Sequence, residues 1–274
     1  MNSRPVLEPL DLVELEQAMK RLEQPSLAAR IAHRIGAPVE KMIGLLPAKA
    51  SGVIASAARA AIHAALKLAL RTLGSRTAPA GAPSSAATRW HKLAGAASGA
   101  AGGAFGLAAL AVELPVSTTI MMRAIASVAR SEGADLAQPE VQLECVMVLG
   151  LGSHARADDD AAEIGYFAAR EALSRAVGTA ATHIASHGLA KEGAPALVRL
   201  ITLVAERYAV NVTEKAAAQL VPLAGAVGGA AINAIFIDHF QEVARGHFTL
   251  RRLERKYGMA EVQAAARSLR SGAT

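Results

Sequence analysis

Two long uncharged stretches, rich in Gly and Ala, dominate the pattern of hydrophobic and polar positions along the chain. The first covers residues 93–112 (LAGAASGAAGGAFGLAALAV), and the second covers residues 221–236 (VPLAGAVGGAAINAIF). Each is followed by an acidic residue and then by apolar residues that recur at helical spacing. We therefore predict two central Gly/Ala-rich helices, with the rest of the chain packed around them.

Glycines in both stretches recur every four residues and so lie on one face of each predicted helix. Because small residues let two backbones approach closely, the two faces are predicted either to meet or to form a groove for a flat apolar ligand. Twenty uncharged residues also match a membrane span in length. Ala and Gly transfer poorly into lipid, however, so a buried hairpin is favoured over a membrane-inserted one. The groove glycines are Gly95, Gly99, Gly103, Gly225 and Gly229.

The remaining sequence alternates between helical patterns and turn residues, and it has no convincing β-branched alternating run. Apolar residues at i, i+4 spacing predict a helix over 54–73, and Ser26 and Gly133 stand where helix caps are expected. Pro115 is predicted to end the first Gly-rich helix, because residues before proline avoid the helical region. The predicted fold class is all-α, a multi-helix bundle.

Three segments are predicted along the chain. Residues 1–73 form an N-terminal helical segment that packs on the body. Residues 74–89, rich in Gly, Ala, Pro and Ser, form a flexible linker. Residues 90–274 form the main helical domain.

Composition narrows the range of functions. Hydrophobic residues make up 52% of the 274 residues and charged residues 19%, so the chain is too apolar to be disordered. The net charge of +6 favours an acidic partner, either nucleic acid or an anionic membrane surface. Basic residues are scattered and aromatic stacking platforms are absent, so no nucleic-acid partner is expected. Trp90, His91 and Lys92 are predicted to contact the membrane surface, and the alternative is that Trp90 packs on the outside of the body.

The single cysteine and the N-terminus indicate the compartment. Cys145 lies in an apolar run, so it is predicted to be an inert core residue without an internal disulfide. The first residues carry acids and a proline where a secretory signal has its apolar region. We expect a cytoplasmic protein, peripheral to the inner face of the cell membrane, and we expect no cofactor.

Acids and histidines near the second Gly-rich stretch form the best candidate for a catalytic site. Asp238, His239 and Glu242 share a helical region, and Glu113 follows the first stretch. A metal-dependent hydrolase could be built from these four residues. The favoured interpretation is a buried polar network that joins the two helices. Glu113 and Asp238 are then expected to lie near each other, mostly buried, and bonded to Arg, His or backbone groups, because an unpaired buried carboxylate is costly.

Other catalytic patterns fail. The glycines before residue 107 lack the Gly-Lys-Ser/Thr of a P-loop. His183 and His187 have metal-ligand spacing, but Ile184 stands where the glutamate of HExxH would be, so a structural or surface pair is favoured.

A shift of 125 residues aligns several positions of the two Gly-rich regions. An old duplication, with two hairpins packed about a pseudo-twofold axis, would produce this pattern. Chance matches in a low-complexity background would produce it too, and both explanations stay open. The coinciding pairs are Gly103 with Gly228, Glu113 with Asp238, Arg130 with Arg255, and Gly133 with Gly258.

The region from about residue 90 to 258 resembles the bacterial EcsC protein family. The resemblance rests on the first Gly-rich block continued through ELPVSTTIMMRAIASVARSEGADL, on EIGYFAAR, and on the second block followed by HFTLRRLERKYG. Glu113 stands where the family commonly has an aspartate. The resemblance implies a helical protein, soluble or peripheral to a membrane, sometimes encoded near transport functions. It implies no established activity and assigns no catalytic residue.

Two functions therefore follow as hypotheses. The first is a peripheral membrane protein that binds anionic lipid or an amphipathic ligand, with an ABC transporter component as a further partner. The alternative is the metal-dependent hydrolase.

Overall fold

The computed structural model describes residues 7–23, 25–36, 39–73, 107–153, 162–188, 194–220 and 225–271. Within these ranges the chain forms helices and contains no strand, which confirms the all-α prediction. The helices are α1 (Pro9–Leu22), α2 (Leu27–Ile35), α3 (Val39–Ile43), α4 (Ala50–Leu68), the π-helical turn η1 (Ala69–Leu73), α6 (Leu107–Ser131), α7 (Pro139–Leu151), α8 (Ala162–His187), α9 (Pro195–Gln219), α10 (Gly225–Tyr257) and α11 (Met259–Ser271).

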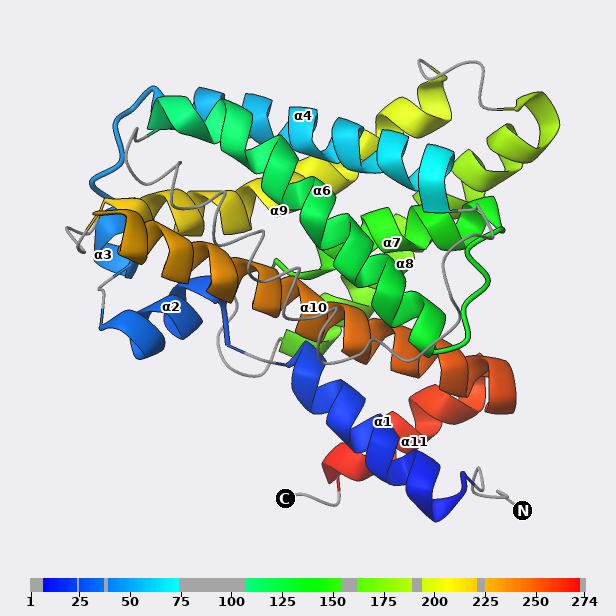
Figure 1. Ribbon diagram of the computed structural model, residues 1–274. Coiled ribbons are helices and arrows are strands. Elements are labelled where there is room, and N and C mark those ends of the chain that lie inside the picture. Colours follow the sequence, from blue (N-terminus) through cyan, green and yellow to red (C-terminus); the bar gives the residue numbers. More distant parts are fainter. Residues whose placement is uncertain are drawn as a thin grey trace.

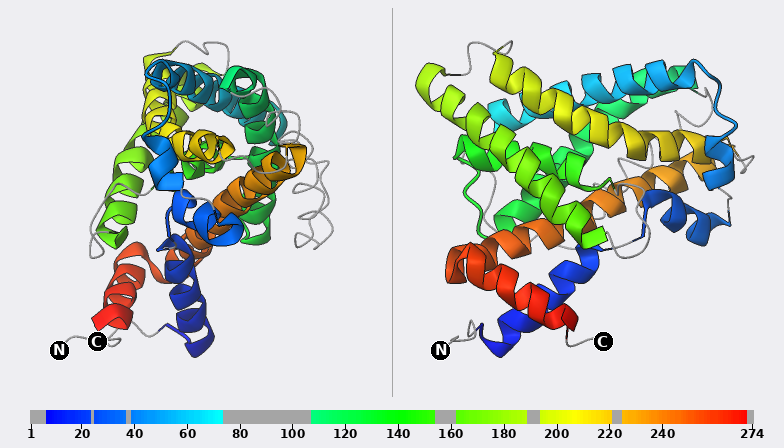
Figure 2. Two further views of the ribbon diagram at one scale, coloured as in Figure 1. Left: turned by 90° about the vertical axis from the view of Figure 1, so that its left-hand side faces the viewer. Right: turned by 180° about the vertical axis from the view of Figure 1, so that it is seen from behind.

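Helix α10 is the organising element of the bundle. Its 33 residues run across the molecule and contact α1, α2, α6, α7, α9 and α11 (Figure 1). Helix α4 packs on α6 and α9. Helices α1 and α11 lie together at the end of the molecule away from α4 (Figure 2).

The helices of the N-terminal segment each pack on the rest of the chain. Helix α1 lies on α10 and α11, α2 and α3 lie on α9, and α4 lies between α6 and α9. The buried face of α4 is made of Ala, Ile and Leu side chains that belong to the same hydrophobic core as those of α6 to α11.

The core is largely aliphatic, with a small aromatic cluster at its centre. Tyr208 of α9 lies against Phe236 and Phe240 of α10, with ring centroids 6.0 and 5.5 Å away. All three side chains are fully buried. Aromatic pairs at such distances add about 0.5–1.5 kcal/mol to the stabilisation from burial.

Local sequence signals explain several helix ends. The Ser26 side chain accepts a hydrogen bond from the backbone N–H of Ala29, as an N-cap does. Gly133 follows α6 with a φ of 71°, a left-handed conformation that favours glycine.

The prediction that Pro115 ends a helix is wrong, because Pro115 lies inside α6. A proline in a helix leaves the carbonyl four residues earlier without its usual N–H partner. That residue is Ala111, which is exposed. Water can therefore solvate the freed carbonyl, and the helix continues.

Candidate functional site

A buried ion pair at the centre of the bundle contains Glu113, the first predicted site residue. The Nζ of Lys215 in α9 donates to Oε1 of Glu113 in α6 over 2.6 Å and to Oδ1 of Asn233 in α10 over 2.7 Å. Lys215 and Asn233 are fully buried, and Glu113 is 6% exposed. The ammonium also lies 4.6 Å from the ring centroid of Phe236. The pair therefore joins three helices.

The surroundings of this ion pair favour a structural role. Burial lowers the pKa of Lys215, and the carboxylate of Glu113 opposes that shift. Oε2 of Glu113 is buried and has no hydrogen-bond partner among the described residues. Beside it, the hydroxyls of Tyr208 and Thr118 bond over 2.7 Å. The ammonium of Lys215 is fully buried in this cluster.

The other predicted site residues lie on α10. Arginine side chains form ion pairs with the two carboxylates among them, Asp238 and Glu242. Oδ2 of Asp238 accepts from Arg30 over 2.9 Å and from Arg34 over 3.4 Å, both on α2. Glu242 forms ion pairs with Arg21 of α1 and with Arg245 of its own helix. These contacts attach the N-terminal helices to α10.

His239 connects α10 to the end of α7. Its Nε2 lies 2.7 Å from the carbonyl oxygen of Gly152, and its Nδ1 lies 3.3 Å from Nη1 of Arg30. Because a guanidinium can only donate, Nδ1 must accept and Nε2 must carry the proton donated to Gly152. A Cβ at Gly152 would lie 2.6 Å from the ring of Phe240, so this close approach of α7 and α10 requires glycine.

Glu113 and Asp238 are both in polar contacts, as expected, but they face different parts of the fold. The partner of Glu113 is a lysine, whereas the sequence suggested Arg, His or backbone. Asn233 and Asp238 are five residues apart, which is a rotation of roughly 140° around α10. Asn233 faces Lys215 on α9, and Asp238 faces α2. Among the described residues no three His, Cys, Asp or Glu side chains are grouped as metal ligands would be.

Several predicted contact residues lie outside the described part of the chain. These are Gly95, Gly99 and Gly103 of the first groove face, and Trp90, His91 and Lys92 of the predicted membrane contact. Of the second face, Gly225 begins α10 and Gly229 is buried within it. The groove and the Trp90 contact therefore stay predictions.

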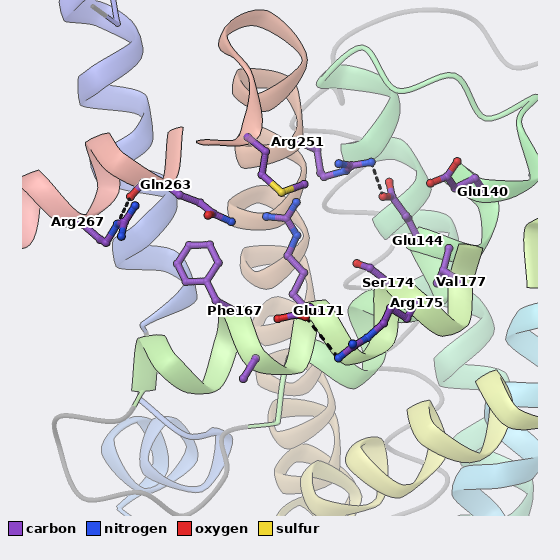
Figure 3. Close-up of a pocket in the computed structure, with 13 residues that line it drawn as sticks. Glu140, Glu144, Phe167, Glu171, Ser174, Arg175, Val177, Arg251, Gln263 and Arg267 are labelled. Carbon is purple, nitrogen blue, oxygen red and sulfur yellow. Dashed lines mark hydrogen bonds and ion pairs between the residues drawn. The ribbon is translucent and has the colours of Figure 1, made fainter. Parts of the chain in front are cut away.

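A pocket of about 1040 Å³ lies between α7, α8, α10 and α11, and the sequence did not reveal it (Figure 3). Arg170 and Glu254 form a buried bidentate pair at its base, over 2.8 and 2.5 Å. Arg251 adds a 2.8 Å ion pair to Glu144. Burial raises the pKa of Glu144, and Arg251 opposes that shift. The sequence signal for this pocket was a charged residue within each apolar helix pattern. That signal was not enough to predict the pocket, because four helices must come together to form it.

Helices α4 and α6 pack on each other, and each exposes basic and apolar side chains. We call these exposed residues together the α4–α6 face: Val53, Arg59, His63, Lys67, Val112, Val116 and Arg123. Over α4, η1 and α6 the only acid is Glu113, which is buried and paired with Lys215. Val112 is 74% exposed and Val116 49% exposed.

Both helices of this face are long and apolar enough to cross a membrane. The qualifying stretches among the described residues are Ala50–Leu73 and Leu110–Ser131. In the most apolar 18-residue window of each, 44% and 56% of the residues are buried inside the protein. Core helices of soluble proteins meet the same criterion, so length and composition alone decide nothing here.

Comparison with models of known protein families shows to which family the chain belongs. A model of the EcsC protein family matches residues 10–253, which include both Glu113 with its partner Lys215 and most of the pocket. The chain belongs to the EcsC protein family. The match begins in α1, so the helices before residue 74 also lie within the family region. No curated protein and no solved structure matches the chain.

Proposed function

We propose that this EcsC-family protein binds peripherally to anionic membrane surfaces through the α4–α6 face. The observation that carries the proposal is the charge of that face: Arg59, Lys67 and Arg123 are exposed on it, and no exposed acid accompanies them on α4, η1 or α6. Each Lys or Arg near an anionic leaflet contributes about 1 kcal/mol. Three such residues support weak and reversible binding.

Exposed valines supply the second component of membrane affinity. Val112 and Val116 lie four residues apart on α6, and Val53 of α4 is 40% exposed. Amphipathic surfaces bind membranes by burying apolar side chains in the interface while basic groups contact the headgroups. Residues 90–92, predicted to contact the membrane, lie between these two helices in the chain.

Vesicle co-sedimentation tests the proposal. The protein should bind vesicles of phosphatidylglycerol and phosphatidylcholine at low salt and be released at 1 M salt, where charges are screened beyond about 3 Å. The double variant Arg59→Glu/Lys67→Glu should bind at least about thirtyfold more weakly, since losing two cationic contacts costs about 2 kcal/mol. Neutral vesicles should bind neither protein.

A matched variant controls for total charge. Lys20→Glu/Arg175→Glu makes the same change in net charge on α1 and α8, where both side chains are exposed. It should bind vesicles nearly as well as the unchanged protein. If both double variants lose binding equally, the attraction is general and the α4–α6 face is not the contact. If the unchanged protein stays in solution with anionic vesicles at low salt, the membrane function is wrong.

The hydrolase alternative has no specific observation in its favour. Arginines engage Asp238 and Glu242, and His239 bonds a backbone carbonyl. Partnership with an ABC transporter component, which the family resemblance implies, stays a prediction.

A further inference from the structure

Three ionisable side chains form a line along the exposed side of α4. Arg59, His63 and Lys67 are all exposed, and each stands four residues from the next. Because a helix turns about 100° and rises about 1.5 Å per residue, the three positions lie within roughly 80° of arc and about 12 Å of helix. His63 is the middle one, so a basic residue lies one helical turn away on each side.

The packed side of α4 lies opposite this line. Ala58, Ile62 and Ala65 are fully buried, and α4 packs on α6 and α9. On a helical projection these buried positions lie roughly opposite His63. The imidazole is therefore on the side of α4 that faces away from the core.

The helices nearest to this line carry almost no acid. Helix α4 and the turn η1 contain no acidic residue, and the single acid of α6, Glu113, is buried and paired with Lys215. Arg123 and Arg130 of α6 have the same sign as a protonated imidazole. A proton on His63 is therefore not cancelled by a carboxylate from α4, η1 or α6.

Helices α7 and α9 also pack on α4 and carry four acids. Two of them are engaged by other helices, because Glu144 pairs with α10 and Glu214 accepts a hydrogen bond from the backbone of α2. Glu140 and Glu206 are exposed. Within the described ranges none of the four forms an ion pair with His63. The bases of these two helices are Arg199, Arg207 and Lys215, all on α9.

Histidine is the side chain whose charge ordinarily changes near neutral pH. An unperturbed imidazole is about one-tenth protonated at pH 7.5 and about nine-tenths protonated at pH 5.5. A surface potential of about −30 mV, typical of an anionic leaflet, concentrates protons roughly threefold at the membrane. If a proton strengthens binding to the membrane, the membrane must equally favour uptake of the proton, because linkage is reciprocal.

We propose that protonation of His63 strengthens binding of the α4–α6 face to anionic lipid, so that acidification regulates membrane association. This inference rests on the membrane binding proposed above and adds its regulation. At pH 7.5 the line on α4 carries the two charges of Arg59 and Lys67, and at pH 5.5 His63 makes it three. One further cation near an anionic surface corresponds to about fivefold tighter binding.

Vesicle co-sedimentation at several pH values tests the proposal. Vesicles of phosphatidylglycerol and phosphatidylcholine suit the purpose, because phosphatidylglycerol stays anionic between pH 5.5 and pH 7.5. The unchanged protein should bind about fourfold more tightly at pH 5.5 than at pH 7.5, since protonation is incomplete at both limits. His63→Gln should bind at pH 5.5 about as weakly as the unchanged protein does at pH 7.5.

A variant with a permanent charge makes the test sharper. His63→Lys should bind at pH 7.5 as tightly as the unchanged protein binds at pH 5.5, and its binding should change little with pH. Because His63 is exposed, both variants should keep the helical circular dichroism of the unchanged protein at each pH. A purely structural role for His63 would not make the lysine variant bind more tightly at pH 7.5.

Other histidines supply the controls. His33→Gln and His187→Gln remove exposed imidazoles on α2 and α8, and both variants should keep the fourfold response. If His63→Gln keeps the full response, or if His91→Gln in the predicted membrane contact abolishes it, this inference is overturned and the membrane proposal stands. If the unchanged protein binds anionic vesicles at neither pH, the membrane proposal and this inference fail together.

Discussion

The buried Glu113–Lys215 pair makes a strong prediction about stability. Replacing Lys215 by Met leaves an apolar side chain of similar length and deprives the Glu113 carboxylate of its counter-ion. A glutamate side chain has an ordinary pKa near 4.3. Keeping such a carboxyl group protonated at pH 7 therefore costs about 3.7 kcal/mol. Breaking buried pairs in other proteins costs about 3–5 kcal/mol, which agrees with this figure.

The loss is large relative to the whole protein. Native proteins are stable by about 5–15 kcal/mol, so Lys215→Met should remove a substantial part of the free energy of unfolding. For a chain of this size the thermal midpoint should fall by roughly 6–20 °C. Urea unfolding followed by circular dichroism at 222 nm measures the free energy directly.

The pH dependence separates a lost charge partner from a simple packing defect. The unfolded chain releases the carboxyl proton above about pH 4.3, whereas the folded variant retains it. The pKa of this carboxyl group is thus higher in the folded variant than in the unfolded chain. The variant is therefore destabilised more as the pH rises and less as the pH falls. The difference between variant and unchanged protein should shrink by about 1.4 kcal/mol per pH unit between pH 7 and pH 5.

Two further variants complete the test. The double variant Glu113→Leu/Lys215→Met removes both charges and should recover most of the stability, because apolar replacement of a whole buried pair is often neutral or stabilising. Lys20→Met, which breaks an exposed i, i+4 pair, should cost only about 0.3–0.5 kcal/mol. A loss below about 1 kcal/mol for Lys215→Met, or a loss independent of pH, would refute the reasoning.

The remaining predictions concern packing and acid sensitivity. Gly246→Ala should lose about 1–3 kcal/mol in urea unfolding, because its Cβ would lie 2.9 Å from the carbonyl oxygen of Ala18. Gly178→Ala on α8 meets open space and should instead gain about 0.5–1 kcal/mol, so equal effects would contradict the packing argument. Burial lowers the pKa of His247 well below 6.5, so its imidazole stays neutral while the unfolded chain takes up a proton. The protein should therefore lose about 1.4 kcal/mol of stability between pH 7.5 and pH 5.5. The hydroxyl of Tyr166 lies 3.0 Å from Nδ1 of His247. His247→Asn, which keeps a polar partner for that hydroxyl, should remove most of the pH dependence.

Local sequence patterns predicted where helices form better than they predicted where each helix ends. The Ser26 cap and the Gly133 end follow from side-chain and backbone chemistry within a few residues, so the sequence carries that information. Pro115 failed as a helix end because the exposure of Ala111 decides whether a proline is tolerated. Exposure is a property of the packed molecule.

Some features of the candidate site could likewise be predicted from the sequence, and others could not. That Glu113 would be buried in a polar contact followed from the apolar residues around it and from the cost of an unpaired buried carboxylate. That its partner would be Lys215, 102 residues later, did not follow. Similarly, Cys145 was expected to be inert, and it is fully buried, with burial raising its pKa.

The sequence by itself determined that the chain is helical, because composition and a 3.6-residue period are properties that short segments carry by themselves. The resemblance to the EcsC family rested separately on the two Gly-rich blocks and the motifs that follow them. Only the tertiary structure decided that α4 and α6 pack on each other with basic residues exposed on both, and that α7, α8, α10 and α11 enclose a pocket. An apolar stripe specifies that a helix must be covered but leaves open which neighbour covers it, because many neighbours bury the same area. The choice is made by all the helices packing at once, and the α4–α6 face and the pocket are both consequences of that choice.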